Sequence, residues 1–205
     1  MRSIFCLFIV YVLCFARAGR AETDPVILIL GDSLSAAYGM QQEESWPRLL
    51  QNRLTENGYA YRIFNSSIAG DTTEGGLTRL PRLLTGLQPE VVIIELGGND
   101  GLRGLSLEVT RNNLQSMIDL SKQAGASVIL AGIRLPPNYG RKYTEQFSEM
   151  FVSLAKTSSV KLIPFLLEGI ALDSTLMLED GIHPTAQAQT KVLQNVWQVL
   201  ELVID

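Results

Sequence analysis

The chain has 205 residues, the length of one compact domain rather than two. Hydrophobic residues make up 46% and charged residues 19%, which supplies a sizeable core and excludes a disordered chain. The net charge of -4 offers no basic surface for nucleic acid. One histidine and two cysteines cannot build the clusters of most zinc or iron sites, so we expect no metal and no cofactor.

The first element is predicted to be a cleaved secretory signal peptide, residues 1–21. Residues 4–15 are unbrokenly apolar, a run too short for a membrane-spanning helix, which needs about 18 to 20 residues. Small residues follow the run, and cleavage after Ala18 or Ala21 would leave a domain that begins near residue 22. The alternative is an uncleaved anchor, favoured by Arg17 and Arg20 on the wrong side of the run.

Removal of this signal peptide changes the charge and the cysteine content of the mature chain. It takes away three arginines and no acid, which leaves 14 basic against 21 acidic residues, a net charge of -7. It also removes both cysteines, Cys6 and Cys14, so the mature chain has no thiol for a disulfide or a nucleophile. Neither cysteine follows the small residue of a lipid-attachment site, so we expect no membrane anchor after cleavage.

Short apolar runs then alternate with amphipathic stretches. The runs 26–30, 91–94 and 128–131 are typical of parallel strands buried on both faces, with 61–64 and 161–164 as weaker candidates. The spacing of apolar residues predicts helices over 46–54, around 114–118 and over 192–200. This alternation predicts a three-layer α/β/α sandwich around a mostly parallel five-stranded sheet. Ligands of such sheets bind at the carboxyl ends of the strands.

The first loop at that edge reads Gly-Asp-Ser-Leu-Ser and places Ser33 directly after a buried strand. We expect Ser33 to open the next helix, whose amino-terminal amides would face whatever the serine attacks. A turn is the alternative, because glycine, aspartate and serine are common where strands end.

Two further loops offer hydrogen-bond donors. Gly70 can present its backbone N–H to a ligand because no side chain obstructs the approach. Asn99, in Gly-Gly-Asn-Asp-Gly, offers a side-chain amide that can hold an oxyanion. Each loop taken alone is equally consistent with an ordinary turn.

The last candidate is Asp180-Gly-Ile-His183-Pro184, which contains the only histidine of the chain. An imidazole can accept a proton near neutral pH, and a carboxylate three residues earlier can fix its tautomer. We expect Pro184 to lie in the first turn of the C-terminal helix, giving the base a rigid support. A surface histidine beside a helix cap is the alternative.

Ser33, Gly70, Asn99 and His183 together, in this order, resemble the four sequence blocks of the SGNH, or GDSL, hydrolase family, whose fold is flavodoxin-like. The segments 96–104 and 133–140 resemble more narrowly the periplasmic thioesterases, lysophospholipases and arylesterases of Gram-negative bacteria. The match covers essentially the whole mature chain. Ala37, where that group often has glycine, leaves the substrate preference open.

The resemblance implies a catalytic triad of Ser33 as nucleophile, His183 as base and then acid, and Asp180 as the group that orients His183. It implies an oxyanion hole formed by the backbone N–H groups of Ser33 and Gly70 and the side-chain amide of Asn99. The substrates would be fatty acyl esters or thioesters, the protein a monomer, and its location the periplasm.

Other residues near these blocks have two interpretations each. Ser35 is a rival nucleophile or a helix-opening residue, and Glu95 is a functional acid or a hydrogen-bonded structural carboxylate. The glycine-rich segment 97–104 is a mobile cover or an ordinary turn. An acyl-chain groove is expected to be lined by Leu102, Leu105, Leu135, Pro136 and Tyr139.

Two other functions remain open at the level of sequence. Carbohydrate O-acetylesterases use the same blocks, although leucines near the site favour acyl chains. A non-catalytic lipid- or glycan-binding module can also occur on this fold. Such a module would be expected to lack one of the four block residues, and all four are present.

Overall fold

The computed structural model describes residues 24–204, so the expected signal peptide lies outside the described residues. Five parallel strands form one sheet in the order β2-β1-β3-β4-β5. The strands are β1 Val26–Gly31, β2 Arg62–Asn65, β3 Val91–Glu95, β4 Ser127–Ala131 and β5 Lys161–Ile163. All five lie where the apolar runs predicted them, and the α/β sandwich is confirmed.

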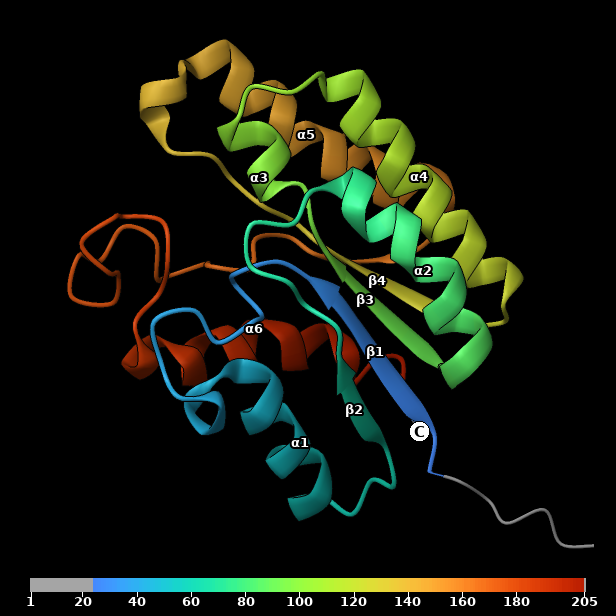
Figure 1. Ribbon diagram of the computed structural model, residues 1–205. Helices are drawn as coiled ribbons and strands as arrows, with labels where there is room; N and C mark the ends of the chain where they lie inside the picture. The colour runs from blue at the N-terminus through green and yellow to red at the C-terminus, as the bar shows by residue number, and fades with distance from the viewer. Residues whose placement is uncertain (1–23, 205) are drawn as a thin grey trace, which may run out of the picture.

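Helices cover both faces of the sheet (Figure 1). One face carries α1 Trp46–Glu56 and α6 Gln189–Leu200, and the other carries α2 Thr73–Leu87, α4 Leu107–Gln123 and α5 Arg141–Ser158. Short helical turns are η1 Gln42–Glu44, α3 Gly98–Leu102, η2 Pro137–Tyr139 and η3 Ala186–Ala188.

The core follows from the alternation of side chains along each strand. In β1, Ile27 and Ile29 pack with α1 and α6, whereas Leu28 and Leu30 pack with α2, α4 and α5. Because both faces are covered, the central strands are apolar at nearly every position rather than at every second one. This explains why they are visible in the sequence as continuous runs.

Two long helices were not predicted. The α2 sequence contains three glycines and Pro81, which obscure its stripe of apolar residues. It forms nevertheless, because Thr72 caps its first turn and Leu80 and Leu84 are buried one turn apart. In α5 the buried stripe extends from Phe147 to Ser158.

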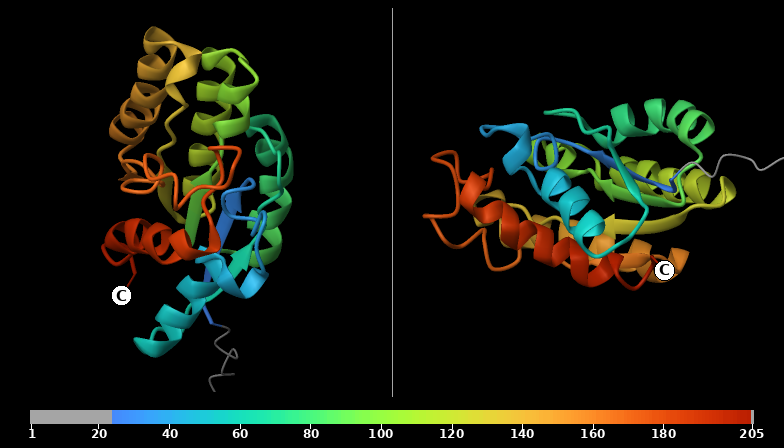
Figure 2. Two further views of the ribbon diagram at one scale, coloured as in Figure 1. Left: turned by 90° about the vertical axis from the view of Figure 1, so that its left-hand side faces the viewer. Right: turned by 90° about the horizontal axis from the view of Figure 1, so that it is seen from below.

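The strand order reverses between β1 and β3, which places the loops after these two strands side by side. The ends of the described chain lie at the opposite edge of the sheet, away from these loops (Figure 2, right). None of the helices within residues 24–204 has the length and apolar character needed to cross a membrane.

Candidate active site

Ser33 lies two residues after β1, at the carboxyl edge of the sheet. The expected helix does not begin there: residues 33–39 form consecutive turns, and α1 begins only at Trp46. Two backbone hydrogen bonds, from Ser35 to Asp32 and from Met40 to Ala37, close these turns. Ala37 adopts a positive φ of 60°, which a continuous helix excludes. No helix dipole therefore acts on Ser33 from its own loop.

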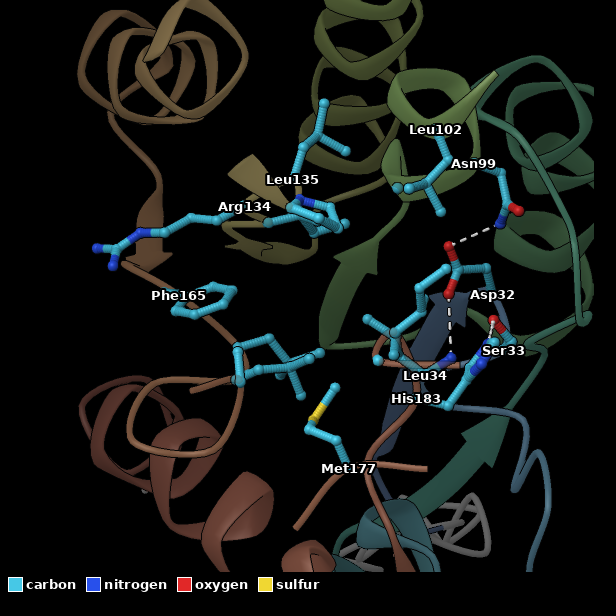
Figure 3. A pocket seen from close by; sticks show the side chains of 18 of the residues that line it. Asp32, Ser33, Leu34, Asn99, Leu102, Arg134, Leu135, Phe165, Met177 and His183 are labelled. Atoms are coloured by element: carbon cyan, nitrogen blue, oxygen red, sulfur yellow. Dashed lines mark hydrogen bonds between the residues drawn. The ribbon is translucent and has the colours of Figure 1, made fainter. Parts of the chain in front are cut away.

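His183 contacts both Ser33 and Asp180. Figure 3 shows its ring beside Ser33. Its Nε2 lies 2.8 Å from Ser33 Oγ, and its Nδ1 lies 2.7 Å from Asp180 Oδ2. With the proton on Nδ1, the imidazole donates to the carboxylate and Nε2 can accept the serine proton. Burial raises the pKa of Asp180, but hydrogen bonds from the backbone and ring of His183 and from the Ile182 N–H outweigh it, so the pKa is lowered. The carboxylate stays ionised.

His183 is supported by a short antiparallel pairing of two chain segments. The expected support, the first turn of the C-terminal helix, is not what holds it. Pro184 pairs with Met177, and the Leu178 N–H donates to the His183 carbonyl at 2.8 Å. The helix α6 begins five residues later, at Gln189. The imidazole also contacts the Tyr38 ring, with centroids 4.2 Å apart and the ring planes tilted by 31°. This ring contact joins two distant loops and has no local sequence signal.

Two backbone amides at the site have no acceptor within residues 24–204. Among the described residues, neither the Ser33 N–H nor the Gly70 N–H donates a hydrogen bond. Gly70 has φ of 78°, a conformation that favours glycine. Asn99, in α3, donates one Nδ2 hydrogen to Asp32 Oδ2 at 3.0 Å, which leaves its second hydrogen for a ligand. The structure brings all three sequence-predicted donors to the same edge of the sheet.

Asp32 and Glu95 form a buried acidic pair beneath this edge. The backbone N–H of Asp32 donates to Glu95 Oε2 at 3.2 Å, and Asp32 Oδ1 accepts from the Leu34 N–H. Burial raises the pKa of Asp32 to about 6, against the lowering by hydrogen bonds from Leu34 and Asn99. Burial and the nearby Asp32 carboxylate raise the pKa of Glu95 well above its usual range.

The contacts with this pair also distinguish the two serines of the first loop. Ser35 is fully buried, and its Oγ donates to Glu95 Oε2 at 2.7 Å. Ser33 is only half-buried and contacts His183. Ser35 is therefore a structural partner of Glu95 and neither opens a helix nor faces the site.

A cavity of about 630 Å³ extends from Ser33 and His183 towards Arg134 and Phe165 (Figure 3). Its lining is mostly apolar, with contributions from Leu34, Leu102, Ile133, Leu135, Pro136, Phe165 and Met177. At the far end Arg134 lies over the Phe165 ring, 4.7 Å from its centroid, and pairs with Glu168 at 3.5 Å. The wall from 165 to 177 was not predicted, although residues 162–167 are visibly apolar.

Leu102, Leu135 and Pro136 line this cavity as expected, but Leu105 and Tyr139 do not. Leu105 follows the short helix α3 and its side chain is exposed. The Tyr139 hydroxyl instead donates to the Leu102 carbonyl at 3.0 Å. Tyr143 holds the neighbouring Gly101 carbonyl at 3.3 Å. The expected glycine-rich cover is thus partly helical and tied to the segment around η2.

A serine, an imidazole and a carboxylate in series, beside unpaired amides at the edge of a parallel sheet, define a serine hydrolase of the α/β class. The chain belongs to the GDSL-like lipase/acylhydrolase family, whose model matches residues 29–191.

Similar proteins span nearly the same length. Esterase TesA of Pseudomonas aeruginosa is 44% identical over 98% of each chain. Thioesterase 1/protease 1/lysophospholipase L1 of Escherichia coli is 46% identical over 89% of this chain and 85% of its own. A crystal structure of TesA is 47% identical, with a TM-score of 0.86 over 87% of this chain and 99% of that chain.

Proposed function

We propose that the protein hydrolyses carboxylic ester and thioester bonds of fatty acyl substrates through an acyl-enzyme on Ser33. The observation that carries this proposal is the 2.8 Å contact between Ser33 Oγ and His183 Nε2 at the edge of an apolar cavity. The names of the relatives, an esterase and a thioesterase/lysophospholipase, support the choice of bond.

In the first half-reaction, His183 Nε2 takes the proton of Ser33 Oγ as the oxygen attacks the acyl carbonyl carbon. Asp180, kept ionised by its hydrogen bonds, stabilises the imidazolium that forms. The Ser33 and Gly70 N–H groups and the Asn99 amide stabilise the oxyanion. His183 then protonates the leaving oxygen or sulfur, which departs and leaves the acyl-enzyme.

In the second half-reaction, water replaces the leaving group. His183 takes a proton from the water as it attacks the acyl carbonyl carbon, and then returns that proton to Ser33 Oγ as the fatty acid leaves. The original Ser33 proton thus departs on the alcohol or thiol, and a proton from water replaces it on Ser33 Oγ. Neither half-reaction requires a metal or a redox cofactor.

The cavity supports fatty acyl groups over small polar acyl donors. Its walls are side chains of leucine, isoleucine, proline and phenylalanine, which offer an acyl chain burial from water. A carbohydrate O-acetylesterase would be expected to present polar groups for the sugar hydroxyls. A non-catalytic module would have no use for a serine in contact with an imidazole.

We further propose that the protein is exported as a precursor, loses its signal peptide by cleavage after Ala18 or Ala21, and acts in the periplasm as a monomer without a membrane anchor. Mass spectrometry of the protein from the periplasm should give a chain that begins at residue 19 or 22. A chain that retains Met1 and stays with membranes would contradict this part.

The activity is tested with p-nitrophenyl esters of increasing acyl length and with acyl-thioesters, using the mature protein. We expect hydrolysis that survives chelators and thiol reagents and falls to background in Ser33→Ala and His183→Ala. Wild-type-like hydrolysis by a folded Ser33→Ala protein would overturn the proposal. Exclusive activity on acetylated sugars would favour the carbohydrate esterase.

A further inference from the structure

Arg79 makes a set of contacts that the reaction scheme does not use. It lies in α2, and its side chain is 19% exposed. Its Nε and Nη2 donate to Asp71 Oδ2 at 3.0 and 2.8 Å, and its Nη1 donates to the carbonyl and hydroxyl of Ser66. Its Nη2 also lies 3.3 Å from the Gly31 carbonyl. All three guanidinium nitrogens are therefore engaged.

These acceptors belong to the two loops that carry the reacting groups. Gly31 ends β1 and precedes Ser33 by two residues. Ser66 and Asp71 are the two ends of the segment 66–71, which contains Gly70. The same Gly31 carbonyl also accepts from the Ile68 N–H at 3.1 Å, so the two loops share an acceptor.

The Gly70–Asp71 peptide is fixed on both sides. The Asp71 N–H donates to the Ile68 carbonyl at 3.0 Å, and the Gly70 carbonyl accepts from Arg103 at 2.8 Å. The Gly70 N–H, by contrast, has no acceptor among the described residues. The backbone around this N–H is thus held in place while the N–H itself is left for a ligand.

From this geometry we infer that Arg79, through Asp71, is a positioning residue that holds the Gly70 N–H at a fixed place relative to Ser33 Oγ. The inference rests on the proposed function, because it concerns the oxyanion of the same reaction. Stabilisation of an oxyanion depends on donors that are already in place, and misplacement by about 1 Å can cost 100-fold in rate. Arg79 would therefore act on kcat and leave substrate binding nearly unchanged.

An arginine is needed for this role because its planar fork reaches several acceptors at once. A lysine at position 79 keeps the charge and can still pair with Asp71, but it cannot also bridge Ser66 and Gly31. Arg79→Lys therefore separates bridging from charge. Arg82 is exposed in the same helix and makes no side-chain hydrogen bond or ion pair within the described part of the chain, so Arg82→Lys provides the control.

A second variant perturbs Asp71, the partner of Arg79. A Cβ on Gly75 would lie 1.9 Å from Asp71 Oδ1, so Gly75→Ala must displace the Asp71 carboxylate. Alanine favours a helix over glycine by about 1 kcal/mol, so this change does not weaken α2 itself. Gly86→Ala is the matched control, because a Cβ there meets nothing within 4 Å.

The experiment measures kcat, KM, thermal midpoint and the rate of inactivation by an organophosphate, whose phosphoryl oxygen would occupy the oxyanion site. For folded Arg79→Lys and Gly75→Ala we expect kcat and the inactivation rate to fall together, about 10- to 100-fold, with KM within about twofold. Arg82→Lys and Gly86→Ala should behave as the wild type. Ser33→Ala is measured alongside.

If folded Arg79→Lys and Gly75→Ala keep the wild-type kcat while Ser33→Ala is inactive, the role of Arg79 is overturned and the proposed function stands. A loss of thermal stability without a change in kcat would likewise reduce Arg79 to a structural residue. A folded Ser33→Ala protein with full activity would instead overturn the proposed function, and with it the role of Arg79.

Discussion

Asn99 connects the buried acidic pair to the reacting edge of the sheet. Its amide is held by Asp32 Oδ2, and Asp32 is held in turn by the Leu34 N–H and by its own N–H bond to Glu95. A carboxylate that accepts one amide hydrogen fixes the direction of the other. Asp32 is therefore placed to orient Asn99, although the sequence shows only that it precedes the serine.

The first prediction concerns Asn99. Replacing Asn99 by alanine removes one donor that would be most effective when negative charge develops on the acyl oxygen. We expect kcat to fall about 10²- to 10³-fold with little change in KM, as found when a single oxyanion donor is removed. Steady-state kinetics on a short p-nitrophenyl ester measure this. An undiminished kcat would move the role away from Asn99.

Ala37 shows what a single residue of sequence leaves undetermined. The sequence identifies it as a departure from a glycine common in similar proteins. The structure explains why glycine suits this place, since φ is 60° and an L-residue in the left-handed region is strained by about 1 to 2 kcal/mol. The structure also shows that consecutive turns over residues 33–39, and not a helix, begin at Ser33.

At the scale of elements, the walls of the cavity determine which acyl chains fit. Leu135 follows β4 in the chain, is almost fully buried and lines the cavity. Leu105 was expected to line it too but is exposed beyond α3. The two leucines therefore form a test and its control.

The second prediction is that Leu135→Trp lowers activity on long acyl esters far more than on acetyl or butyryl esters, because the larger ring fills space that the chain would occupy. We expect the ratio of kcat/KM values for long and short chains to fall about tenfold, since about 1.4 kcal/mol of lost apolar burial corresponds to that factor. Leu105→Trp should leave the ratio unchanged. Equal effects of both variants would remove the groove assignment.

The predictable elements are those whose signal is local. Strands β1, β3 and β4 are buried on both faces and appear as apolar runs, and the four site loops follow from their positions after strands or before the last helix. The support of His183 was predicted wrongly because it depends on pairing between Met177 and Pro184 and on ring contact with Tyr38. Such contacts form only when the chain is folded, so no spacing in the sequence encodes them visibly.

For the whole molecule, the buried acidic pair couples stability to pH. The pKa of Asp32 is about 6 in the folded protein, against an ordinary value of 3.8, and the pKa of Glu95 is raised as well. The folded state thus binds protons more tightly than the unfolded state. The raised pKa of Asp32 therefore adds to the free energy of unfolding at low pH. This contribution is fully present below pH 4 and is lost as pH rises through about 6, and for Asp32 it amounts to about 3 kcal/mol.

The third prediction is that the free energy of unfolding is higher at pH 5 than at pH 7.5. Urea unfolding at the two pH values measures it, and Asp32→Asn should reduce the difference. The lowered pKa values of Asp173 and Asp180 act in the opposite direction, but only below about pH 4. A wild-type protein that gains stability from pH 5 to 7.5 would contradict the account of the pair.

The fold brings residues 33, 70, 99 and 183 to one edge of a sheet from four separate loops, and the central claim is that Ser33 is the nucleophile among them. The most direct measurement is to treat the protein with a fluorophosphonate and to locate the adduct by peptide mass spectrometry. We predict one adduct, on Ser33, that does not form in His183→Ala. An adduct on Ser35 or another residue, or continued labelling of Ser33→Ala, would contradict the claim.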